Sequence, residues 1–422
     1  MQEGCISLNK GSTAFLCRRG VYKSSILFQM KKHRKIRVGI IFGGKSTEHE
    51  VSLQSAKNVV AALPKNKYEP VLIGIDKEGK WHRSTGADYL LNSNNPKLIA
   101  LNKMGRQEVG LVTGDGRELM VLQNSERASL DVVFPVLHGP LGEDGTIQGL
   151  LKLMDIPFVG PSVLGSAIGM DKDVQKRLLR DAGIPVAKFL TIRTTNKIRK
   201  YERKQEKSFG VTFEQAKKEL GLPMFVKPAN AGSSVGVSKV KTEADFKKAV
   251  SDAFKYDNKI LIEEGIDGRE IECAVLGNED PIASVPGEVK PNHEFYSYEA
   301  KYIDENGAAC EIPAKLTAKI AKKVQETAVA TFKALECEGM ARVDMFVTGL
   351  SSPTFQGGEL KRGSVRVLVN EINTIPGFTK ISMYPKLWEA SGIPYPKLID
   401  RLIELALARA KREKRIQTNF KA

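Results

Sequence analysis

The sequence predicts an α/β protein of two or three domains, the first of which is built on a parallel sheet. Residues 36–42 (IRVGIIF) are a short run of branched apolar side chains that ends in two glycines, which is typical of a buried parallel strand. Residues 52–63 have apolar side chains at helical spacing, and the apolar runs 71–75 and 131–137 indicate two more strands. This alternation predicts a βαβ layout, in which ligands bind at the carboxyl ends of the strands.

The middle of the chain predicts a second domain. Its expected elements are a helix at 171–182, strands at 225–227, 237–241 and 259–263, and a helix at 242–254. Thr242 is the expected N-cap of the last helix, and Asp245 takes the place of the acid in a capping box. Gly265 and Gly268 follow the last strand and suit a hinge.

The remainder predicts a third domain and two insertions. Its expected elements are strands at 270–276, 341–347 and 365–372 and helices at 317–335 and 398–410. The polar stretches 193–215 and 348–364 are interpreted as insertions. We therefore predict an N-terminal extension at 1–35 and domains at 36–169, 170–267 and 268–422.

The composition is that of an ordinary globular protein, with 41% hydrophobic and 27% charged residues. No window approaches the roughly 18 consecutive apolar residues of a membrane-spanning helix, so we expect a soluble chain. The five cysteines form no C-x-x-C pair and the five histidines form no H-x-x-x-H pair. This pattern disfavours a disulfide framework and a zinc site, and it favours a reducing compartment.

The net charge of +16 suggests nucleic-acid binding, but residues 1–36 contribute +7 and leave only +9 for the rest. The basic runs 197–207 and 409–415 lack the interleaved aromatic side chains of a single-strand binding surface, so we interpret them as solvated faces. Residues 1–35 are basic and rich in hydroxyls, as organellar transit peptides are. We favour a simpler interpretation, in which the natural chain starts at Met30.

The sequence matches the P-loop pattern, but the structure predicted for these residues does not suit a P-loop. Residues 39–46 (GIIFGGKS) match G-x-x-x-x-G-K-[ST]. A P-loop needs an open loop after its first glycine, and here Ile-Ile-Phe continues the predicted strand. We therefore do not expect Lys45 to bind phosphate.

The strongest chemical signal is the pair of strands 340–347 (MARVDMFV) and 365–377 (VRVLVNEINTIPG). Alternation puts Arg342 and Asp344 on one face of the first strand, and Glu371 and Asn373 on one face of the second, with Asn370 opposite. Two carboxylates and an amide oxygen are ligands that Mg²⁺ prefers, and Arg342 would lie beside them, placed to hold a phosphoryl charge. The alternative is a cross-strand salt bridge between Arg342 and Glu371.

A Gly/Ser loop at 232–236 (GSSVG) offers backbone N–H groups and hydroxyls to a phosphate, and Lys172 and Lys227 can supply charge to it. Glu263 lies at the end of a strand, where a hinge could contact an adenine, and Glu270 could accept from a ribose. Taken alone, these acids would be ordinary surface residues.

Two Gly-rich turns, 43–52 (GGKSTEHEVS) and 138–145 (HGPLGEDG), follow strands of the first domain and point into one crevice. Glu48 and His138 in these turns could bind the ammonium and carboxylate of an amino acid. A structural role is an equal alternative for His138.

Together these segments resemble the D-alanine–D-alanine ligases, a family of ATP-grasp enzymes. The resemblance covers about residues 36 to 412 and rests on seven motifs in order: GGKSTEHEVS, LHGPLGEDGTIQG, MDK, FVKPANAGSSVG, YEAKY, ARVDMF and NEINTIPGFT. It implies an ATP-grasp fold, with an N-terminal Rossmann-like parallel-sheet domain and two subdomains that sandwich the nucleotide.

The resemblance also implies a role for individual residues. Catalytic roles fall to Glu48, Ser233, Arg342 and Tyr302, and substrate contacts to Ser52, His138, Gly377 and Ser382. Nucleotide contacts fall to Lys172, Lys227, Glu263, Glu270 and Lys301, and two Mg²⁺ (or Mn²⁺) ions to Asp344, Glu371 and Asn373, with Glu371 bridging.

The implied reaction joins two D-alanine molecules through a D-alanyl phosphate, with ATP as co-substrate, for peptidoglycan synthesis. Tyr302 in Y-E-A-K-Y resembles the dipeptide-forming type, and the alternatives are a D-alanine–D-lactate ligase or another ATP-grasp carboxylate–amine ligase. The resemblance further implies a cytoplasmic homodimer without nucleic-acid or membrane partners.

Overall fold

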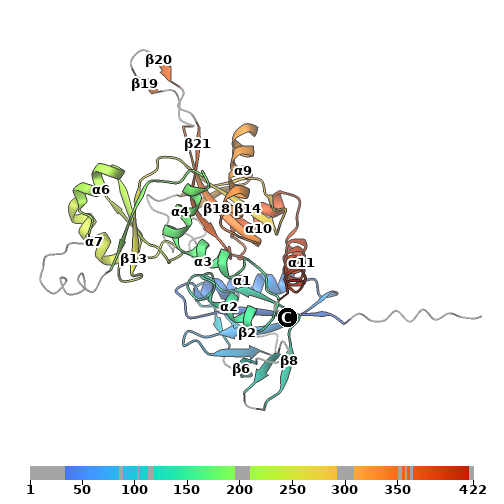
Figure 1. The fold of residues 1–422 in the computed structure, drawn as a ribbon. Helices are drawn as coiled ribbons and strands as arrows, with labels where there is room; N and C mark the ends of the chain where they lie inside the picture. The colour runs from blue at the N-terminus through green and yellow to red at the C-terminus, as the bar shows by residue number, and fades with distance from the viewer. Residues whose placement is uncertain are drawn as a thin grey trace, which may run out of the picture. The chain divides into compact units, whose positions relative to one another are not determined.

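The computed structural model describes residues 34–84, 89–102, 104–112, 118–122, 124–194, 210–291, 308–349, 354–356, 359–361 and 365–417. Residues 35–422 group into one structural unit. Among the residues so described, no helix has the length and apolar character needed to cross a membrane. The fold is mixed α/β, as predicted, with three main sheets (Figure 1).

The first sheet has seven strands in the order β8-β7-β6-β3-β2-β1-β9. Its strands are β1 (Ile36–Gly43), β2 (Tyr68–Ile75), β3 (Trp81–Ser84), β6 (Arg106–Val112), β7 (Glu118–Val121), β8 (Arg127–Ser129) and β9 (Val132–Val136), and β4 (Leu90–Leu91) pairs with β5 (Ala100–Leu101) separately. Strand β1 pairs in parallel with β2 and β9, which confirms the predicted parallel strands. The antiparallel strands β3 and β6–β8 were not predicted.

The P-loop pattern lies inside β1. Gly39 pairs with Val71 and Gly43 with Ile75, so the residues that a P-loop would use as a phosphate cradle are bonded into the sheet. Lys45 is exposed beyond the strand end. The rejection of a P-loop from the sequence is therefore confirmed.

The helix α1 (His49–Ala62) connects β1 to β2 within the first sheet, and two helices, α2 (Thr146–Leu153) and α3 (Val163–Met170), connect β9 to the next part of the chain. The helix α4 (Lys172–Asp181) follows at once, and Asp171 is its N-cap, accepting from the backbone N–H groups of Asp173 and Val174. This cap explains why the helix begins at Lys172, since it satisfies two otherwise unpaired donors.

The second sheet is antiparallel, in the order β10-β13-β11-β12. Its strands are β10 (Phe189–Arg193), β11 (Met224–Pro228), β12 (Ser238–Val240) and β13 (Lys259–Glu264), and its helices are α6 (Phe213–Leu220) and α7 (Glu243–Ala253). Both helices pack through one apolar cluster on one side of this sheet (Figure 1). The predicted capping box of α7 is confirmed, because Thr242 and Asp245 exchange side-chain-to-backbone hydrogen bonds.

The third sheet has the order β17-β16-β14-β18-β21, and β15 pairs with β14. Its strands are β14 (Arg269–Gly277), β15 (Ile282–Ala283), β16 (Gly287–Pro291), β17 (Ala308–Glu311), β18 (Gly339–Thr348) and β21 (Arg366–Asn373). The helix α9 (Ala318–Ala334) buries Val324, Ala328 and Phe332 against it. Between β18 and β21, where an insertion was predicted, β19 (Thr354–Gln356) and β20 (Glu359–Lys361) form a two-stranded hairpin.

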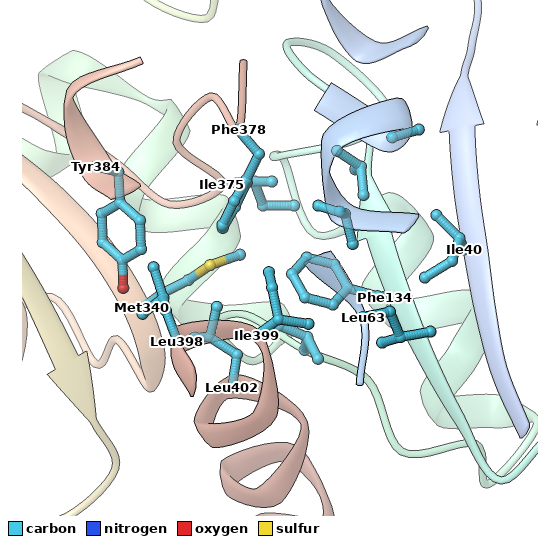
Figure 2. Packing of buried hydrophobic residues seen from close by; sticks show 14 of the residues in the cluster. Ile40, Leu63, Phe134, Met340, Ile375, Phe378, Tyr384, Leu398, Ile399 and Leu402 are labelled. Carbon is cyan, nitrogen blue, oxygen red and sulfur yellow. The ribbon is translucent and has the colours of Figure 1, made fainter. Parts of the chain in front are cut away.

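The C-terminal helices α10 (Met383–Ala390) and α11 (Tyr395–Glu413) share one core with the first sheet. Figure 2 shows Phe134 of that sheet beside Ile399 of α11, and the same cluster includes Ile40, Leu398 and Leu402. Each predicted domain contributes one main sheet, but the first and third are joined by this core. The domain boundaries themselves stay a prediction.

Candidate active site

Ten predicted site residues line one cavity, which we call the main cavity. They are Glu48, His138, Ser233, Glu270, Arg342, Asp344, Glu371, Asn373, Gly377 and Ser382. They come from the first sheet's turns, the Gly/Ser loop and the third sheet. Residues separated by more than 300 positions in the sequence therefore meet at one place.

Glu48 lies where the first sheet meets the Gly/Ser loop. Its carboxylate accepts a hydrogen bond from Ser233 Oγ. A Cβ built at Gly139 would stand 2.6 Å from Glu48 Oε2, and one at Gly232 would stand 2.8 Å from the same atom. A side chain at either position would displace this carboxylate, and the positive φ of 75° at Gly139 also favours glycine there. Ser233 has a positive φ of 52°, a conformation that costs a non-glycine residue free energy and is often found at functional sites.

Three carboxylates lie side by side across the third sheet, and we call them the carboxylate row. In the strand register, Glu272 of β14 is opposite Asp344 of β18, and Asp344 is opposite Glu371 of β21. Side chains opposite one another on neighbouring strands are roughly 5 Å apart at Cβ. Like charges at that spacing repel, so the row needs cations to be stable.

Arg342 supplies one of these cations. Its Nε and Nη2 donate to the two oxygens of Asp344 at 2.7 and 2.8 Å, and its Nε lies 2.9 Å from Glu272 Oε2. Asn373 Nδ2 also donates to Asp344 Oδ2, at 2.9 Å. Arg342 is therefore paired within its own strand and with β14, a pairing that differs from the Arg342–Glu371 bridge considered from the sequence.

Asn370 departs from the predicted alternation. The register shifts between Asp344 and Met345, so that Asp344 faces Glu371 while Met345 faces Val369. This β-bulge leaves Asn370 as the extra residue, and a bulge re-aims side chains. Asn370 lines the main cavity together with Glu371, although alternation predicted the opposite face.

The predicted nucleotide lysines Lys172 and Lys227 do not line this cavity, but each contacts a residue that does. Lys172 Nζ donates to Ala231 O at 2.9 Å and lies 3.2 Å from Glu371 Oε2. Lys227 Nζ forms an ion pair with Glu263 and donates to Asn370 Oδ1 at 3.4 Å. Both lysines thus hold carboxylates and backbone oxygen in a site where phosphate oxygens could replace those partners.

Two residues predicted to contact the substrate, Ser52 and His138, form hydrogen bonds within the protein instead. Ser52 Oγ is completely buried, accepts from Gly43 N at 2.7 Å and donates to Val136 O. Its hydroxyl joins the ends of β1 and β9, and it does not line the cavity. Its direct contact with substrate stays a prediction that this geometry does not favour.

His138 is also buried and uses both ring nitrogens. Nδ1 lies 3.1 Å from Ile375 O, and Nε2 lies 3.1 Å from Ser55 Oγ. Since a carbonyl can only accept, Nδ1 carries the proton and Nε2 accepts from the hydroxyl. Burial lowers the pKa of His138 to about 4, so the ring is neutral at pH 7. This arrangement supports the structural role that the sequence left open.

Glu143 is a cavity carboxylate that the sequence reasoning did not select. It accepts from Gly139 N at 2.7 Å and from Ile375 N at 3.1 Å, and so joins the turn after β9 to the loop after β21. Burial, and then the charge of Glu48, raise the pKa of Glu143 to about 8. The carboxyl group is therefore partly protonated near neutral pH.

The loop after β21 brings Gly377 close to the start of α10. A Cβ at Gly377 would lie 2.7 Å from Ser382 Oγ. The same hydroxyl accepts from Thr379 N at 3.0 Å and therefore holds the loop that precedes α10, whose N-cap residue is Ser382. Backbone at Gly377 can thus approach a ligand in the cavity.

Two predicted residues, Lys301 and Tyr302, lie outside the described residues. Among the residues that are described, no group of three or more His, Cys, Asp or Glu side chains is placed to hold a metal ion. The predicted ligand set has two carboxylates and one amide, and it therefore requires further oxygens such as those of phosphate.

Four residues of the site were missed from the sequence: Glu143, Lys176, Glu272 and Asn370. Two of them carried a usable signal, because Glu272 is two residues from Glu270 on a strand and Lys176 is four residues from Lys172 on a helix. Glu143 lies in the Gly-rich turn 138–145, and its contact with Ile375 N joins positions too distant in sequence to be predicted. The bulge that turns Asn370 has no signal in the sequence.

A parallel-centred sheet and two further sheets around a cavity of carboxylates and lysines define the class of ATP-grasp ligases. The comparisons agree with this class. The family model described as D-ala D-ala ligase N-terminus matches residues 37–161, and that described as D-ala D-ala ligase C-terminus matches residues 178–404.

Similar proteins indicate which family of ATP-grasp ligases the chain belongs to. The D-alanine–D-alanine ligase of Oceanobacillus iheyensis is 53% identical over 387 residues, which cover 91% of this chain and 99% of the relative. Among solved structures, the D-alanine-D-alanine ligase from Coxiella burnetii matches with a TM-score of 0.70 at 39% identity, covering 90% of this chain and 96% of that one. The VanG D-Ala:D-Ser ligase from Enterococcus faecalis matches with a TM-score of 0.71 at 35% identity, covering 88% and 100%. The chain belongs to the D-alanine–D-alanine ligase family.

Proposed function

We propose that this protein joins two molecules of D-alanine in a reaction driven by ATP, for peptidoglycan synthesis. The observation that carries the proposal is the meeting of Glu48 and Ser233 on one side of the main cavity with the carboxylate row and Arg342 on the other. One side suits the ammonium group of an amino acid, and the other suits the phosphates of ATP and their counterions.

The proposed reaction has two steps. A carboxylate oxygen of the first D-alanine attacks the γ-phosphorus of ATP, and the bond to ADP breaks, giving D-alanyl phosphate. The amine of the second D-alanine then attacks the acyl carbon, loses a proton and displaces phosphate. Arg342 and the backbone of Gly377 are proposed to stabilise the negative oxygen of the tetrahedral intermediate, and Glu48 with Ser233 to orient the first ammonium.

Asp344, Glu371 and Asn373 are proposed to hold two Mg²⁺ ions, with Glu371 bridging. Their oxygens fit hard cations, and Asp344 and Glu371 are direct neighbours across β18 and β21. Bound Mg²⁺ neutralises phosphate charge during phosphoryl transfer. Arg342 and Lys172 contact these carboxylates in the structure, and both must shift when a divalent cation takes their place.

Lys172, Lys227, Glu263, Glu270 and Lys301 are proposed to contact the nucleotide. Lys172 and Lys227 lie on α4 and β11, on either side of the backbone that leads to the Gly/Ser loop. Because the carboxylate of Glu263 is engaged by lysine, we propose that its strand end, and not its side chain, faces the adenine. Tyr302 is proposed to join Glu48 and Ser233, and Ser382 to contact the second D-alanine. The role of His138 becomes one of holding the loop at Ile375.

Incubation of the purified chain with ATP, Mg²⁺ and D-alanine tests the function. We expect phosphate release that depends on D-alanine and a dipeptide mass equal to D-alanyl-D-alanine. Parallel reactions with D-lactate or D-serine added, across pH 6 to 9, test the other acceptors that relatives of this family use. Absence of phosphate release with D-alanine alone would contradict the proposal. Cytoplasmic location and a homodimer stay predictions.

A further inference from the structure

Lys176 is a buried cation that the proposed chemistry leaves without a task. It lies on α4 one turn after Lys172 and is 0% exposed. Its Nζ forms an ion pair with Glu263 Oε1. An ammonium group removed from water is costly unless it is paired, and hydrophobic side chains of similar volume often serve stability as well as a buried ion pair does.

Glu263 is shared between two lysines. Oε1 contacts Lys176 of α4, and Oε2 contacts Lys227 of β11. Burial acts to raise the pKa of Glu263, but the two ammonium groups outweigh it and leave the pKa lowered. The carboxylate is therefore charged at neutral pH, and it has one more cation than charge balance requires.

The two lysines differ in what else they can reach. Lys227 Nζ also donates to Asn370 Oδ1, which lines the main cavity, at 3.4 Å. Lys176 is completely buried, and its ammonium group is held in place by the ion pair with Glu263. Burial lowers the pKa of Lys176, and the charge of Glu263 acts to raise it. Lys227 is consequently the lysine that can turn toward a phosphate, and Lys176 is the one that stays.

If Lys176 were absent, movement of Lys227 would leave the buried carboxylate of Glu263 without a cation. If Lys227 were the only partner of Glu263, its departure would leave a buried carboxylate unpaired, which typically costs several kcal/mol. We infer that Lys176 is a positioning residue that keeps Glu263 paired while Lys227 leaves it to bind the phosphates of ATP. This inference rests on the proposed ATP site.

Substitution of Lys176 tests this role. In Lys176→Met, Glu263 retains Lys227 as its only cation, so we expect the Kd for ATP to rise roughly tenfold or more. The double variant Lys176→Met/Glu263→Gln removes the charge that captures Lys227. Because the proposed adenine contact is made by the backbone of the strand end and not by the Glu263 side chain, we expect its Kd to return to within about threefold of the unsubstituted chain. This pair is expected to fold even where the single variant does not, because its buried positions are both neutral.

Leu179→Ala is the matched control. Leu179 is a buried residue of the same helix and touches an apolar cluster only, so this change should lower the melting temperature and leave ATP binding unchanged within about twofold. ATP binding is measured by calorimetric titration with MgATP, in parallel with thermal melting.

Three results overturn the inference: Lys176→Met binding ATP as the unsubstituted chain does, the double variant binding as weakly as the single one, or Leu179→Ala weakening ATP binding as much. Failure of the unsubstituted chain to bind ATP would instead contradict the proposed function, so the two failures are distinguishable.

Discussion

Two groups of charged side chains near the main cavity have the same arrangement with opposite charges. Around β13, one carboxylate, Glu263, is held by two lysines. Across β14 and β18, one guanidinium, Arg342, is held by two carboxylates, Asp344 and Glu272. In the first group Lys227 is predicted to contact ATP and Lys176 is not. In the second group Asp344 is predicted to contact a metal ion and Glu272 is not. Each side can therefore release a charged group to the ligand without leaving its partner unpaired.

The largest expected effect comes from breaking the acidic side. Asp344→Asn removes a proposed metal ligand, and we expect the rate of D-alanine-dependent phosphate release to fall roughly 10²–10³-fold. The melting temperature should change little, because Glu272 still pairs with Arg342. A rate within tenfold of the unsubstituted chain would remove Asp344 from the proposed metal site.

The basic side should respond in binding rather than in turnover. Lys227→Met removes a proposed phosphate contact, and we expect the KM for ATP to rise roughly tenfold to a hundredfold. Lys45→Ala is the control, because Lys45 is exposed and belongs to the rejected P-loop pattern. The opposite outcome, with Lys45→Ala defective and Lys227→Met normal, would restore the P-loop interpretation.

The contact that connects the first sheet to the Gly/Ser loop should give a smaller effect. Ser233→Ala removes the hydroxyl that donates to Glu48, and we expect kcat/KM for D-alanine to fall roughly tenfold. Ser234→Ala, at a neighbouring position that does not line the cavity, should change it less than about twofold. Equal effects of the two substitutions would show that loop conformation matters and the Glu48 contact does not.

The smallest effect concerns Glu143, a carboxylate held by backbone N–H groups. Its pKa in the folded chain is raised to about 8 from an ordinary value of 4.5. Its contribution to stability is thus complete below pH 4.5 and is lost as the pH rises through 8. Between pH 7 and pH 8 we expect a loss on the order of 1 kcal/mol in the free energy of unfolding. Urea unfolding should show this slope in the unsubstituted chain and a weaker one in Glu143→Gln.

The sequence predicted the elements with strong local patterns. The apolar runs of β1 and β9 and the capping box at Thr242 describe their surroundings directly, so their structure could be predicted. Strands β3 and β6–β8 were missed although β6, β7 and β8 pair with near neighbours in the chain, because β3, β7 and β8 are only three or four residues long and leave too little sequence for a periodic pattern. The candidate metal ligands Asp344, Glu371 and Asn373 were selected from strand alternation, whereas five further site residues were named only by resemblance to the family: Ser52, Lys301, Tyr302, Gly377 and Ser382.

The site shows the same division between what is local and what is not. Strand alternation correctly put Arg342 beside Asp344, but it could not indicate that Glu272 would complete the carboxylate row. The burial of Ser52 and His138 depends on backbone carbonyls from other strands and loops, at Val136 and Ile375. Residue type alone cannot tell a histidine that contacts substrate from one that braces a loop.

The core shared by the first sheet and α11 bears on how the chain is made. Lys67 Nζ and Tyr68 Oη both donate to Asp400 Oδ1, across 333 and 332 positions of sequence, and Leu398, Ile399 and Leu402 close the same core. Until α11 leaves the ribosome, the apolar face formed by α1, β1 and β9 lacks its cover. The growing chain must therefore keep that face from aggregating for most of translation, and a protein shortened before Tyr395 would depend on chaperones to remain in solution.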